Sequence, residues 1–257
     1  MKLFAFDLDN TILNSKRKIS ITNLEVIDEM ISKGIILIPA TGRSLKGIPN
    51  ELLDRDIRYV IVSNGAKVID LFNDKIIWKS YLSEKELIPL IKHLNKKRLL
   101  FSIHSENDCF DSNLLQILIR KILYNNTSKL LIRFDKILKL GAIYKIQLTF
   151  FSKKKLMKVY NLISGIQSIH VVKSSKHCLE ITNKSATKGN ALRNICDYLK
   201  IERNEVVSIG DNDNDIEMLL FSGTSYAVQN SSENAKNMVD FIVSSNDNNP
   251  LTDIALD

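Results

Sequence analysis

The amino-acid sequence predicts an α/β fold with a parallel-sheet core, interrupted by an inserted α+β domain. Short apolar strands alternate with helical patterns over residues 1–79, as in the βαβ units that build a parallel sheet. The alternation stops near Ser80 and returns at Ser185. We therefore predict a discontinuous core of residues 1–79 and 183–257 around an insertion of residues 80–182.

Buried strands and amphipathic helices take turns in the first part of the core. The first helix is expected to end near Lys33-Gly34, because glycine commonly follows the last turn of a helix. Strands are expected at residues 3–6, 35–38 and 59–62, with helices at residues 21–32 and 44–53 between them. Two short hairpin-like segments follow Asn64-Gly65, at residues 68–71 and 76–78.

The inserted segment begins with a capping box. Ser83 can cap a helix while Glu86, three residues later, reaches back to it, so a helix is expected to run toward Lys97. Further on we expect strands at residues 99–103, 143–151, 169–172 and 178–181 and a helix at residues 153–162. Residues 112–139 are ambiguous, with a helix-like run at 114–123, and the insertion contains no clear catalytic signature.

Helix and strand alternate again in the last part of the chain. A helix is expected at residues 187–199, a buried strand at 206–209 and a helix starting near Asp213. Strands at residues 227–228 and 241–243, a short helix at 233–238 and a final helix from Pro250 complete the core.

Size and composition are those of an ordinary globular chain. Its 257 residues can bury a sizeable core, and apolar stretches such as residues 35–38 are far too short to cross a bilayer. Three widely spaced cysteines argue against a disulfide framework or a zinc site, so Cys109, Cys178 and Cys196 are expected to be buried. Because no signal peptide is recognised, we expect a cytoplasmic protein without a membrane partner.

The net charge of +7 raises the question of nucleic-acid binding. The basic residues are dispersed in pairs and triples, such as residues 96–98 and 153–155, and no aromatic-interleaved basic stripe accompanies them. We therefore expect a solvated basic surface and no nucleic-acid partner. Such a surface would attract an anionic substrate.

Two acids directly follow the first strand. Asp7 and Asp9 are separated by one residue, so an extended backbone directs both carboxylates to the same side. Like charges this close repel each other unless a metal ion or a shared proton intervenes. Asp7-Leu8-Asp9-Asn10-Thr11 therefore predicts a cation site with a potential carboxylate nucleophile, and an ordinary Asp/Asn turn is the alternative.

Thr41-Gly42-Arg43 follows the second strand. Ligands of open α/β sheets bind at the carboxyl ends of the strands, where this turn and Asp7 both fall. A threonine hydroxyl and backbone N–H groups at a glycine turn suit a phosphate oxygen, although a simple glycine turn also explains these residues. Gly42 and Gly47 have the spacing of a P-loop, but Ile48-Pro49 stands where Lys-Ser/Thr is required, which excludes that motif.

Lys188 begins the helix after the insertion, with Thr187 as the expected N-cap. A lysine in the first turn opposes the helix macrodipole, which favours acids at that end. Its position therefore indicates an anionic group nearby, although a solvent-exposed lysine is the simpler interpretation of this residue by itself.

Gly210-Asp211-Asn212-Asp213-Asn214-Asp215 follows the strand at residues 206–209. Three alternating acids indicate that a hard cation is bound through oxygen. An EF-hand calcium loop starting at Asp211 would need glycine and glutamate where the chain has Ile216 and Ser222. Magnesium, held by one or two carboxylates and a substrate phosphate, fits better, and a capped helix start is the alternative.

Taken in order, these segments resemble the four motifs of the haloacid dehalogenase (HAD) superfamily. The motifs are Asp7-x-Asp9-x-Thr11, Thr41-Gly42-Arg43, Lys188 and Gly210-Asp211-x-x-Asn214-Asp215. Ser63-Asn64-Gly65-Ala66, Leu179-Glu180-Ile181 and the insertion resemble its Cof-type phosphatases, which carry a C2B cap. The resemblance covers essentially the whole chain and implies a Rossmann-like HAD core with a C2B-type cap.

The chain departs from the Cof-type pattern at two places. Asn10 stands where glycine is usual, but asparagine tolerates a left-handed backbone, so we expect the turn to be kept. Asn248-Asn249-Pro250 stands where a glycine-containing turn is usual, which concerns only the last helix.

The resemblance implies a role for each motif residue. Asp7 is the nucleophile that forms an aspartyl-phosphate, and Asp9 is the general acid and base. Mg²⁺ is expected at Asp7, Asp9, Asp211 and Asp215, with Asp9 contributing its backbone carbonyl. The phosphoryl oxygens are expected to be bound by Leu8, Thr41, Gly42, Arg43, Lys188 and Asn214.

The function implied is that of a Mg²⁺-dependent phosphatase of small phosphorylated metabolites, sugar phosphates first, acting as a monomer or homodimer. Cap residues such as Arg133, Tyr144, Lys145 and Lys173 could touch the substrate, and none of them is assigned. A phosphomutase of the phosphomannomutase type is the alternative, followed by a non-catalytic phosphate-responsive binding protein. A receiver-type signalling module is disfavoured, because its residue set fits within one small domain.

Overall fold

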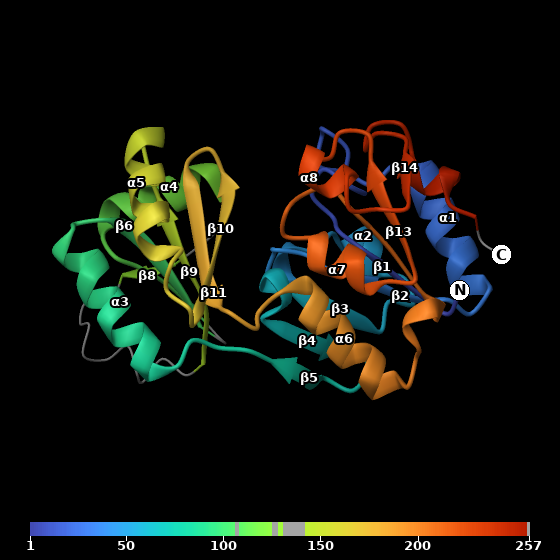
Figure 1. Ribbon diagram of the computed structural model, residues 1–257, viewed down its shortest axis with the longest axis horizontal. Helices are drawn as coiled ribbons and strands as arrows, with labels where there is room; N and C mark the ends of the chain where they lie inside the picture. Colours follow the sequence, from blue (N-terminus) through green and yellow to red (C-terminus); the bar gives the residue numbers. More distant parts are fainter. Residues whose placement is uncertain (106–107, 125–127, 131–141, 256–257) are drawn as a thin grey trace. The chain divides into compact units, whose positions relative to one another are not determined.

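The computed structural model describes residues 1–105, 108–124, 128–130 and 142–255. The chain separates into two compact units (Figure 1). The first unit comprises Met1–Lys79 and Thr187–Asp257, and the second unit comprises Ser80–Ala186. The ambiguous segment at residues 131–139, which includes Arg133, lies outside the described residues.

The second unit continues four residues beyond the boundary that we predicted at residue 182. Two side-chain hydrogen bonds account for the difference. The Ser80 hydroxyl donates to Asn183 Oδ1 at 3.1 Å and lies 2.7 Å from the Ser185 hydroxyl. These contacts tie the segment after the last strand of the second unit to the residue at which that unit begins.

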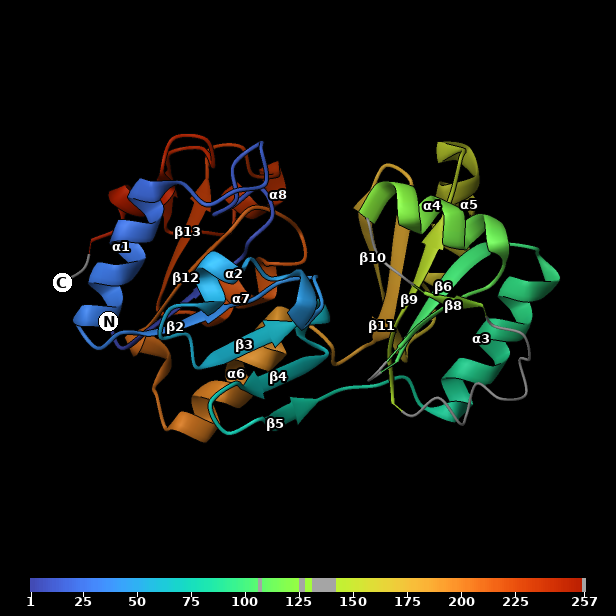
Figure 2. The same ribbon diagram turned by 180° about the vertical axis from the view of Figure 1, so that it is seen from behind.

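A five-stranded parallel sheet forms the centre of the first unit (Figure 2). Its strand order is β14-β13-β12-β1-β2, so the first strand of the chain lies between β12 and β2. The strands are β1 Leu3–Phe6, β2 Ile36–Pro39, β12 Val206–Gly210, β13 Thr224–Val228 and β14 Phe241–Val243. Each neighbouring pair is parallel, which confirms the predicted parallel-sheet core.

Helices pack on both faces of this sheet. They are α1 Ile21–Ser32, α2 Asn50–Leu53, α6 Lys188–Leu199, α7 Ile216–Phe221 and α8 Glu233–Lys236. Phe4 and Phe6 pack in one apolar cluster with residues of α1, whereas Leu3 and Ala5 pack in another with residues of α6 and α7. Because successive side chains of a strand alternate between faces, β1 is apolar at all of its positions.

A small antiparallel sheet follows β2 in the first unit. Its strands are β3 Tyr59–Val62, β4 Lys67–Asp70 and β5 Lys75–Lys79. A parallel bridge between Ala40 and Ile61 places β3 beside the end of β2. The two hairpin-like segments that we predicted after Asn64-Gly65 are β4 and β5, and they pair with each other.

The prediction of one helix at residues 44–53 is wrong. The chain forms a short 3₁₀ turn at Leu45–Gly47 and then the separate helix α2, with Ile48 extended between them (φ −76°, ψ 134°). Pro49 is the cause, because proline lacks an N–H and its ring disfavours helical backbone at the preceding residue.

Two helices predicted near the end of the chain also differ from the structure. The segment from Pro250 forms a single 3₁₀ turn, Pro250–Asp253. Helix α7 begins at Ile216 and not near Asp213. The residues between β12 and α7 form a turn instead.

The second unit is built on one six-stranded sheet with the order β10-β11-β9-β6-β7-β8. Its elements are α3 Glu84–Lys96, β6 Leu100–Ser105, β7 Cys109–Asp111, α4 Leu114–Tyr124, β8 Lys129–Leu130, β9 Ile143–Thr149, α5 Lys153–Ile163, β10 Ile169–Ser175 and β11 Cys178–Asn183. The predicted capping box is present, since the Ser83 N–H donates to Glu86 Oε2 at 2.7 Å. Leu94 of α3 and Leu156 of α5 belong to the apolar core of this unit.

Composition also predicted that the three cysteines are buried and that the apolar stretches are too short to cross a bilayer. Cys178 and Cys196 are buried as predicted, whereas Cys109 is half-buried on the short strand β7. Among the described residues, no helix has the length and apolarity that crossing a bilayer requires.

Candidate active site

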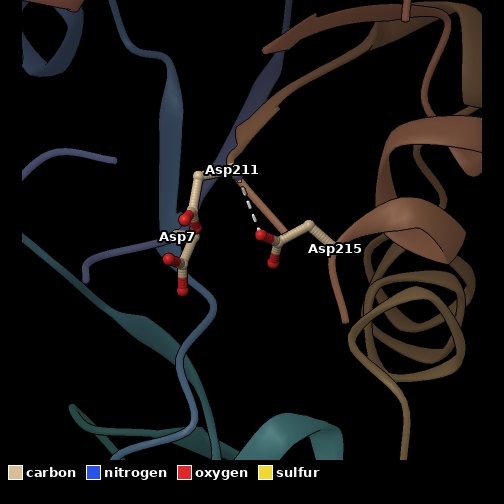
Figure 3. A group of neighbouring side chains, drawn as sticks. All are labelled: Asp7, Asp211 and Asp215. Atoms are coloured by element: carbon tan, nitrogen blue, oxygen red, sulfur yellow. Dashed lines mark hydrogen bonds between the residues drawn. The ribbon is translucent and has the colours of Figure 1, made fainter. Parts of the chain in front are cut away.

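Three buried aspartates meet at the carboxyl ends of β1 and β12. These strands are paired in parallel with Phe6 opposite Ile209, so Asp7 and Asp211 leave the sheet at the same edge. Asp215 reaches them from the turn before α7. One carboxylate oxygen of each aspartate lies within 4.8 Å of the others, and Figure 3 shows the three side chains gathered around one point.

Lys188 is the first residue of α6 and is completely buried. Thr187 caps the helix, because its hydroxyl accepts the N–H of Asn190 at 3.1 Å. The Lys188 ammonium forms ion pairs with Asp7 and Asp215. Burial lowers the pKa of Lys188, but these two carboxylates outweigh burial and raise the pKa above its usual value. The anionic group indicated by the sequence is therefore the aspartate cluster. The alternative interpretation, a solvent-exposed lysine, is wrong.

The acids outnumber the base in this cluster. Burial is the main reason why the pKa of Asp7 lies well above its usual value and that of Asp211 rises to about 7. Neighbouring carboxylates raise both pKa values further, while Lys188 opposes the rise. The Thr11 hydroxyl lies 3.4 Å from Asp7 Oδ2 and 3.3 Å from Asp211 Oδ1. Three carboxylates around one ammonium leave negative charge that a bound cation would neutralise.

The donor set of the cluster fits Mg²⁺, because hard cations prefer carboxylate oxygens. Asp215 is the most engaged of the three acids. Its Oδ1 binds Lys188, and its Oδ2 accepts the backbone N–H groups of Asp211 at 3.0 Å and Asn212 at 3.1 Å. Asp7 and Asp211 are therefore the residues best able to hold the ion, while Asp215 shapes the turn that carries Asp211.

The Asp9 carboxylate lies outside the described aspartate cluster. It is half-exposed and bound by Arg43, whose Nε donates to Oδ2 at 2.8 Å and whose Nη2 donates to Oδ1 at 2.5 Å. The hydrogen bond with Asp9 raises the pKa of Arg43. Arg43 Nη1 also donates to the Gly47 carbonyl at 2.7 Å. The arginine therefore holds the Asp9 carboxylate, and phosphate binding by Arg43 stays a prediction.

The remaining predicted phosphate-binding residues lie at the same strand edge. Thr41 is completely buried after β2, and its Oγ1 accepts the Arg43 N–H at 3.1 Å. The Leu8 side chain is buried in the apolar core, so Leu8 could reach a phosphate only through its backbone. Its carbonyl accepts the N–H groups of Thr11, Ile12 and Leu13 in the turn that follows β1.

Asn10 adopts the left-handed backbone that its position requires, with φ +59°. The Asn230 side chain donates to the Asn10 carbonyl at 2.8 Å and so helps to fix the turn. The expectation that asparagine keeps this turn in place of glycine is confirmed.

Asn64 is a site residue for which we predicted no role. Its Oδ1 accepts a hydrogen bond from Asn214 Nδ2 at 3.2 Å, and its backbone N–H donates to the Thr41 carbonyl at 3.0 Å. The Asn-Gly pair was recognisable in the sequence as a turn signal. Its link to Asn214 was not, because the two asparagines are separated by 150 positions.

Comparison with known proteins gives consistent matches over nearly the whole chain. A sequence profile of the haloacid dehalogenase-like hydrolases matches residues 4–254. A protein of Buchnera aphidicola subsp. Baizongia pistaciae, provisionally named a phosphatase, is 31% identical over 244 residues, covering 89% of this chain and 86% of its own. The Bacillus subtilis protein 5-amino-6-(5-phospho-D-ribitylamino)uracil phosphatase YwtE is 27% identical over 273 residues, covering 97% and 95%.

Solved structures show the same architecture. A haloacid dehalogenase-like hydrolase from Bacteroides thetaiotaomicron has a TM-score of 0.86 at 25% identity, covering 98% of this chain and 97% of its own. TM0651 from Thermotoga maritima has a TM-score of 0.86 at 23% identity, covering 100% and 98%, and at this identity the likeness concerns the fold.

Proposed function

The chain belongs to the haloacid dehalogenase-like hydrolases, and we propose that it is a Mg²⁺-dependent phosphatase of small phosphorylated metabolites. The observation that carries the proposal is the buried cluster of Asp7, Asp211 and Asp215 around Lys188. It combines a carboxylate that can act as a nucleophile, a pair of acids that can hold a cation, and an ammonium group. Phosphoryl transfer depends on this kind of positioning and charge neutralisation.

Sugar phosphates and related polyol phosphates are the substrates that we propose first. The relative of 27% identity from B. subtilis is named as a phosphatase of a compound with a phosphoribityl group. The net charge of +7 favours the approach of an anionic substrate.

Asp7 would attack the phosphorus atom in line with the leaving oxygen. A bond forms between phosphorus and a carboxylate oxygen of Asp7 while the ester P–O bond breaks, which gives an aspartyl-phosphate. Asp9 would donate a proton to the leaving alkoxide. A water molecule then attacks phosphorus and loses a proton to Asp9, and the bond between phosphorus and Asp7 breaks. Arg43 would orient the Asp9 carboxylate in both steps, as the two hydrogen bonds between these side chains suggest.

Positive charge and hydrogen-bond donors would stabilise the phosphoryl group during transfer. Lys188 favours the ionised form of Asp7 and would bind phosphoryl oxygens together with Asn214. The Thr41 hydroxyl and the backbone N–H groups of Gly42 and Leu8 would supply further donors. Asp7, Asp211 and the Asp9 carbonyl would hold Mg²⁺, which supplies additional positive charge to the phosphoryl oxygens when bound.

Phosphate release from a panel of phosphate monoesters, measured with Mg²⁺ or with EDTA, tests the proposal. Wild type should turn over at least one substrate only with Mg²⁺, and Asp7→Asn should lose activity by at least about 10³-fold because the nucleophile is gone. Asp197→Asn is the matched control, since Asp197 is exposed on α6 away from the cluster. Equal activity of Asp7→Asn and Asp197→Asn would contradict the mechanism.

Product analysis with a hexose phosphate separates the phosphatase from the phosphomutase alternative. A phosphatase releases inorganic phosphate and free sugar, whereas a mutase returns a positional isomer of the sugar phosphate.

A further inference from the structure

Three consecutive residues of the first unit have a left-handed backbone. The φ angles are +53° at Ser63, +58° at Asn64 and +91° at Gly65. Residues other than glycine rarely adopt this conformation, which persists only where the surroundings enforce it. Such strain is concentrated at functional sites. The turn at Ser63–Gly65 is therefore a candidate for a functional role, and its contacts indicate which one.

Two parts of the proposed phosphate site enclose this turn. On one side the Asn64 N–H donates to the Thr41 carbonyl at 3.0 Å, and the Ser63 N–H donates to the Arg43 carbonyl at 2.8 Å. On the other side the turn lies against the start of α6, because a Cβ at Gly65 would stand 2.1 Å from the Thr187 carbonyl oxygen. The turn thus connects the Thr41–Arg43 loop with the helix that begins at Lys188.

The Asn64 side chain reaches a third part of the site. Asn64 is buried, and its Oδ1 accepts a hydrogen bond from Asn214 Nδ2 at 3.2 Å. A Cβ at Gly42 would stand 2.9 Å from this oxygen, so the glycine leaves the room that the carboxamide needs. An acceptor oxygen is thereby held beside the Thr41–Arg43 loop.

We propose that Asn64 is a positioning residue that acts through Asn214, an inference that rests on the proposed function. The last torsion of an asparagine side chain is broad and roughly two-fold, so rotamer preference alone does not decide which end of the Asn214 carboxamide faces a ligand. Because Asn64 Oδ1 is a hydrogen-bond acceptor, it favours the orientation in which the nitrogen of the Asn214 carboxamide, and not its oxygen, faces Asn64. A phosphoryl oxygen is bound by that nitrogen and repelled by the carbonyl oxygen, so the orientation decides whether Asn214 helps or hinders phosphate binding.

A double-mutant cycle with Asn64→Gly and Asn214→Ala tests this coupling, with p-nitrophenyl phosphate as substrate. Glycine adopts positive φ without strain, so Asn64→Gly removes the carboxamide and keeps the turn. We expect kcat/KM to fall by about 10-fold in Asn64→Gly and by about 10²-fold in Asn214→Ala. The double variant should be no worse than Asn214→Ala, because Asn64 then has nothing left to orient. Independent, multiplying losses would overturn the proposal.

Asn64→Asp tests whether Asn64 orients the Asn214 carboxamide or only supports the turn. Aspartate also tolerates a left-handed backbone and keeps an acceptor oxygen for Asn214, but it adds a negative charge beside the proposed phosphate site. We expect KM to rise by about 10-fold while kcat stays within about two-fold of wild type. A fall in kcat of about 10-fold in Asn64→Asp would contradict the acceptor role.

A side-chain NMR measurement decides the question even if wild type turns over no substrate. Asn214→Ala identifies the Asn214 carboxamide signal in a ¹⁵N-labelled sample. The signal should shift and broaden in Asn64→Gly, where the acceptor is lost, and stay sharp in Asn64→Asp, where an acceptor oxygen remains. An unchanged signal in Asn64→Gly would overturn the proposal, whereas inactivity of wild type would count only against the proposed function.

Discussion

Each of the two units buries a lysine, and the two lysines have different surroundings. Lys145 on β9 of the second unit forms an ion pair with Glu180 on the neighbouring strand β11, with 3.0 Å between Nζ and Oε1. Lys188 in the first unit is completely buried and binds Asp7 and Asp215, with Asp211 close by. The ion pair described for Lys145 has one carboxylate, whereas Lys188 lies within a cluster of three aspartates.

The difference separates a buried charge that supports a fold from one that supports a site. In a buried ion pair the two charges offset each other, although desolvation leaves the pair little net stability. Three acids around one ammonium leave an excess of acid groups, which a bound cation can neutralise. The aspartate cluster of the first unit therefore has an excess of acid groups that a bound cation could balance.

Removal of each lysine should have the largest effect. Lys188→Met and Lys145→Met each remove a described cation from buried carboxylates, so each should lose about 3–5 kcal/mol of unfolding free energy. Lys188→Met should also lose turnover by about 10³-fold, because the charge beside the nucleophile is gone. Urea unfolding followed by circular dichroism and the release of phosphate measure the two losses.

A second substitution sharpens the contrast. Lys145→Met/Glu180→Gln should regain most of the lost stability, since it removes both members of one ion pair. Lys188→Met/Asp7→Asn should regain only part of it, because Asp211 and Asp215 remain buried at the site. Equal recovery in the two double variants would refute the idea that acids are in excess around Lys188.

Addition of Mg²⁺ should have the next largest effect. A ligand that binds only the folded state stabilises it by about 2.7 kcal/mol at 100 times its dissociation constant. Wild type should therefore unfold at a higher temperature with Mg²⁺ than with EDTA, and Asp211→Asn should lose most of this difference. The only tryptophan, Trp78, lies on β5 of the first unit, so its fluorescence reports the unfolding of that unit. Asp197→Asn should respond like wild type, and a full response in Asp211→Asn would remove Asp211 from the metal site.

Acidification should have the smallest effect, through an ion pair of the first unit that lies outside the described acidic cluster. Arg58 donates to the buried Asp70 carboxylate at 2.9 Å, and this hydrogen bond is the main cause that lowers the pKa of Asp70 to about 2. A depressed pKa in the folded state contributes stability above the unfolded pKa of about 3.9, and this stability is lost as the pH falls toward 2.

The difference in unfolding free energy between wild type and Asp70→Asn should measure this contribution. We expect about 1 kcal/mol at pH 5, because the Arg58 side chain is partly open to solvent, and almost none near pH 2. Urea titrations followed by Trp78 fluorescence at several pH values give both numbers. A difference that stays constant over this range would show that Asp70 acts through its hydrogen bonds to the turn alone.

Much of the fold could be predicted because its elements have strong local patterns. The strand Leu3–Phe6 and the helix Ile21–Ser32 have the predicted bounds, since one is a continuous apolar run and the other an amphipathic segment with a serine cap. The prediction of a helix at residues 44–53 was wrong. The restriction that Pro49 places on the preceding residue should have outweighed the helical periodicity. Residues 211–215 form a turn and not a helix start, because the Asp215 carboxylate takes up backbone N–H groups of the turn.

The candidate site could be predicted only as a set of motifs. Asp7, Asp211 and Lys188 are recognisable because each stands at the end of a strand or the start of a helix, where ligands of such sheets bind. Which of these charged side chains form ion pairs could not be derived in the same way. Lys188 is separated from Asp7 by 181 positions, and the ion pair between them exists only because β1 and α6 pack together.

By itself, the sequence determined the α/β class, the inserted unit and the order of the four acidic and basic motifs, because strand, helix and turn preferences act over a few neighbouring residues. Only the tertiary structure decided which carboxylates meet, that Arg43 holds Asp9, and that Asn64 accepts a hydrogen bond from Asn214. Those contacts depend on long-range packing of side chains, and local periodicity carries no information about which distant residues face each other.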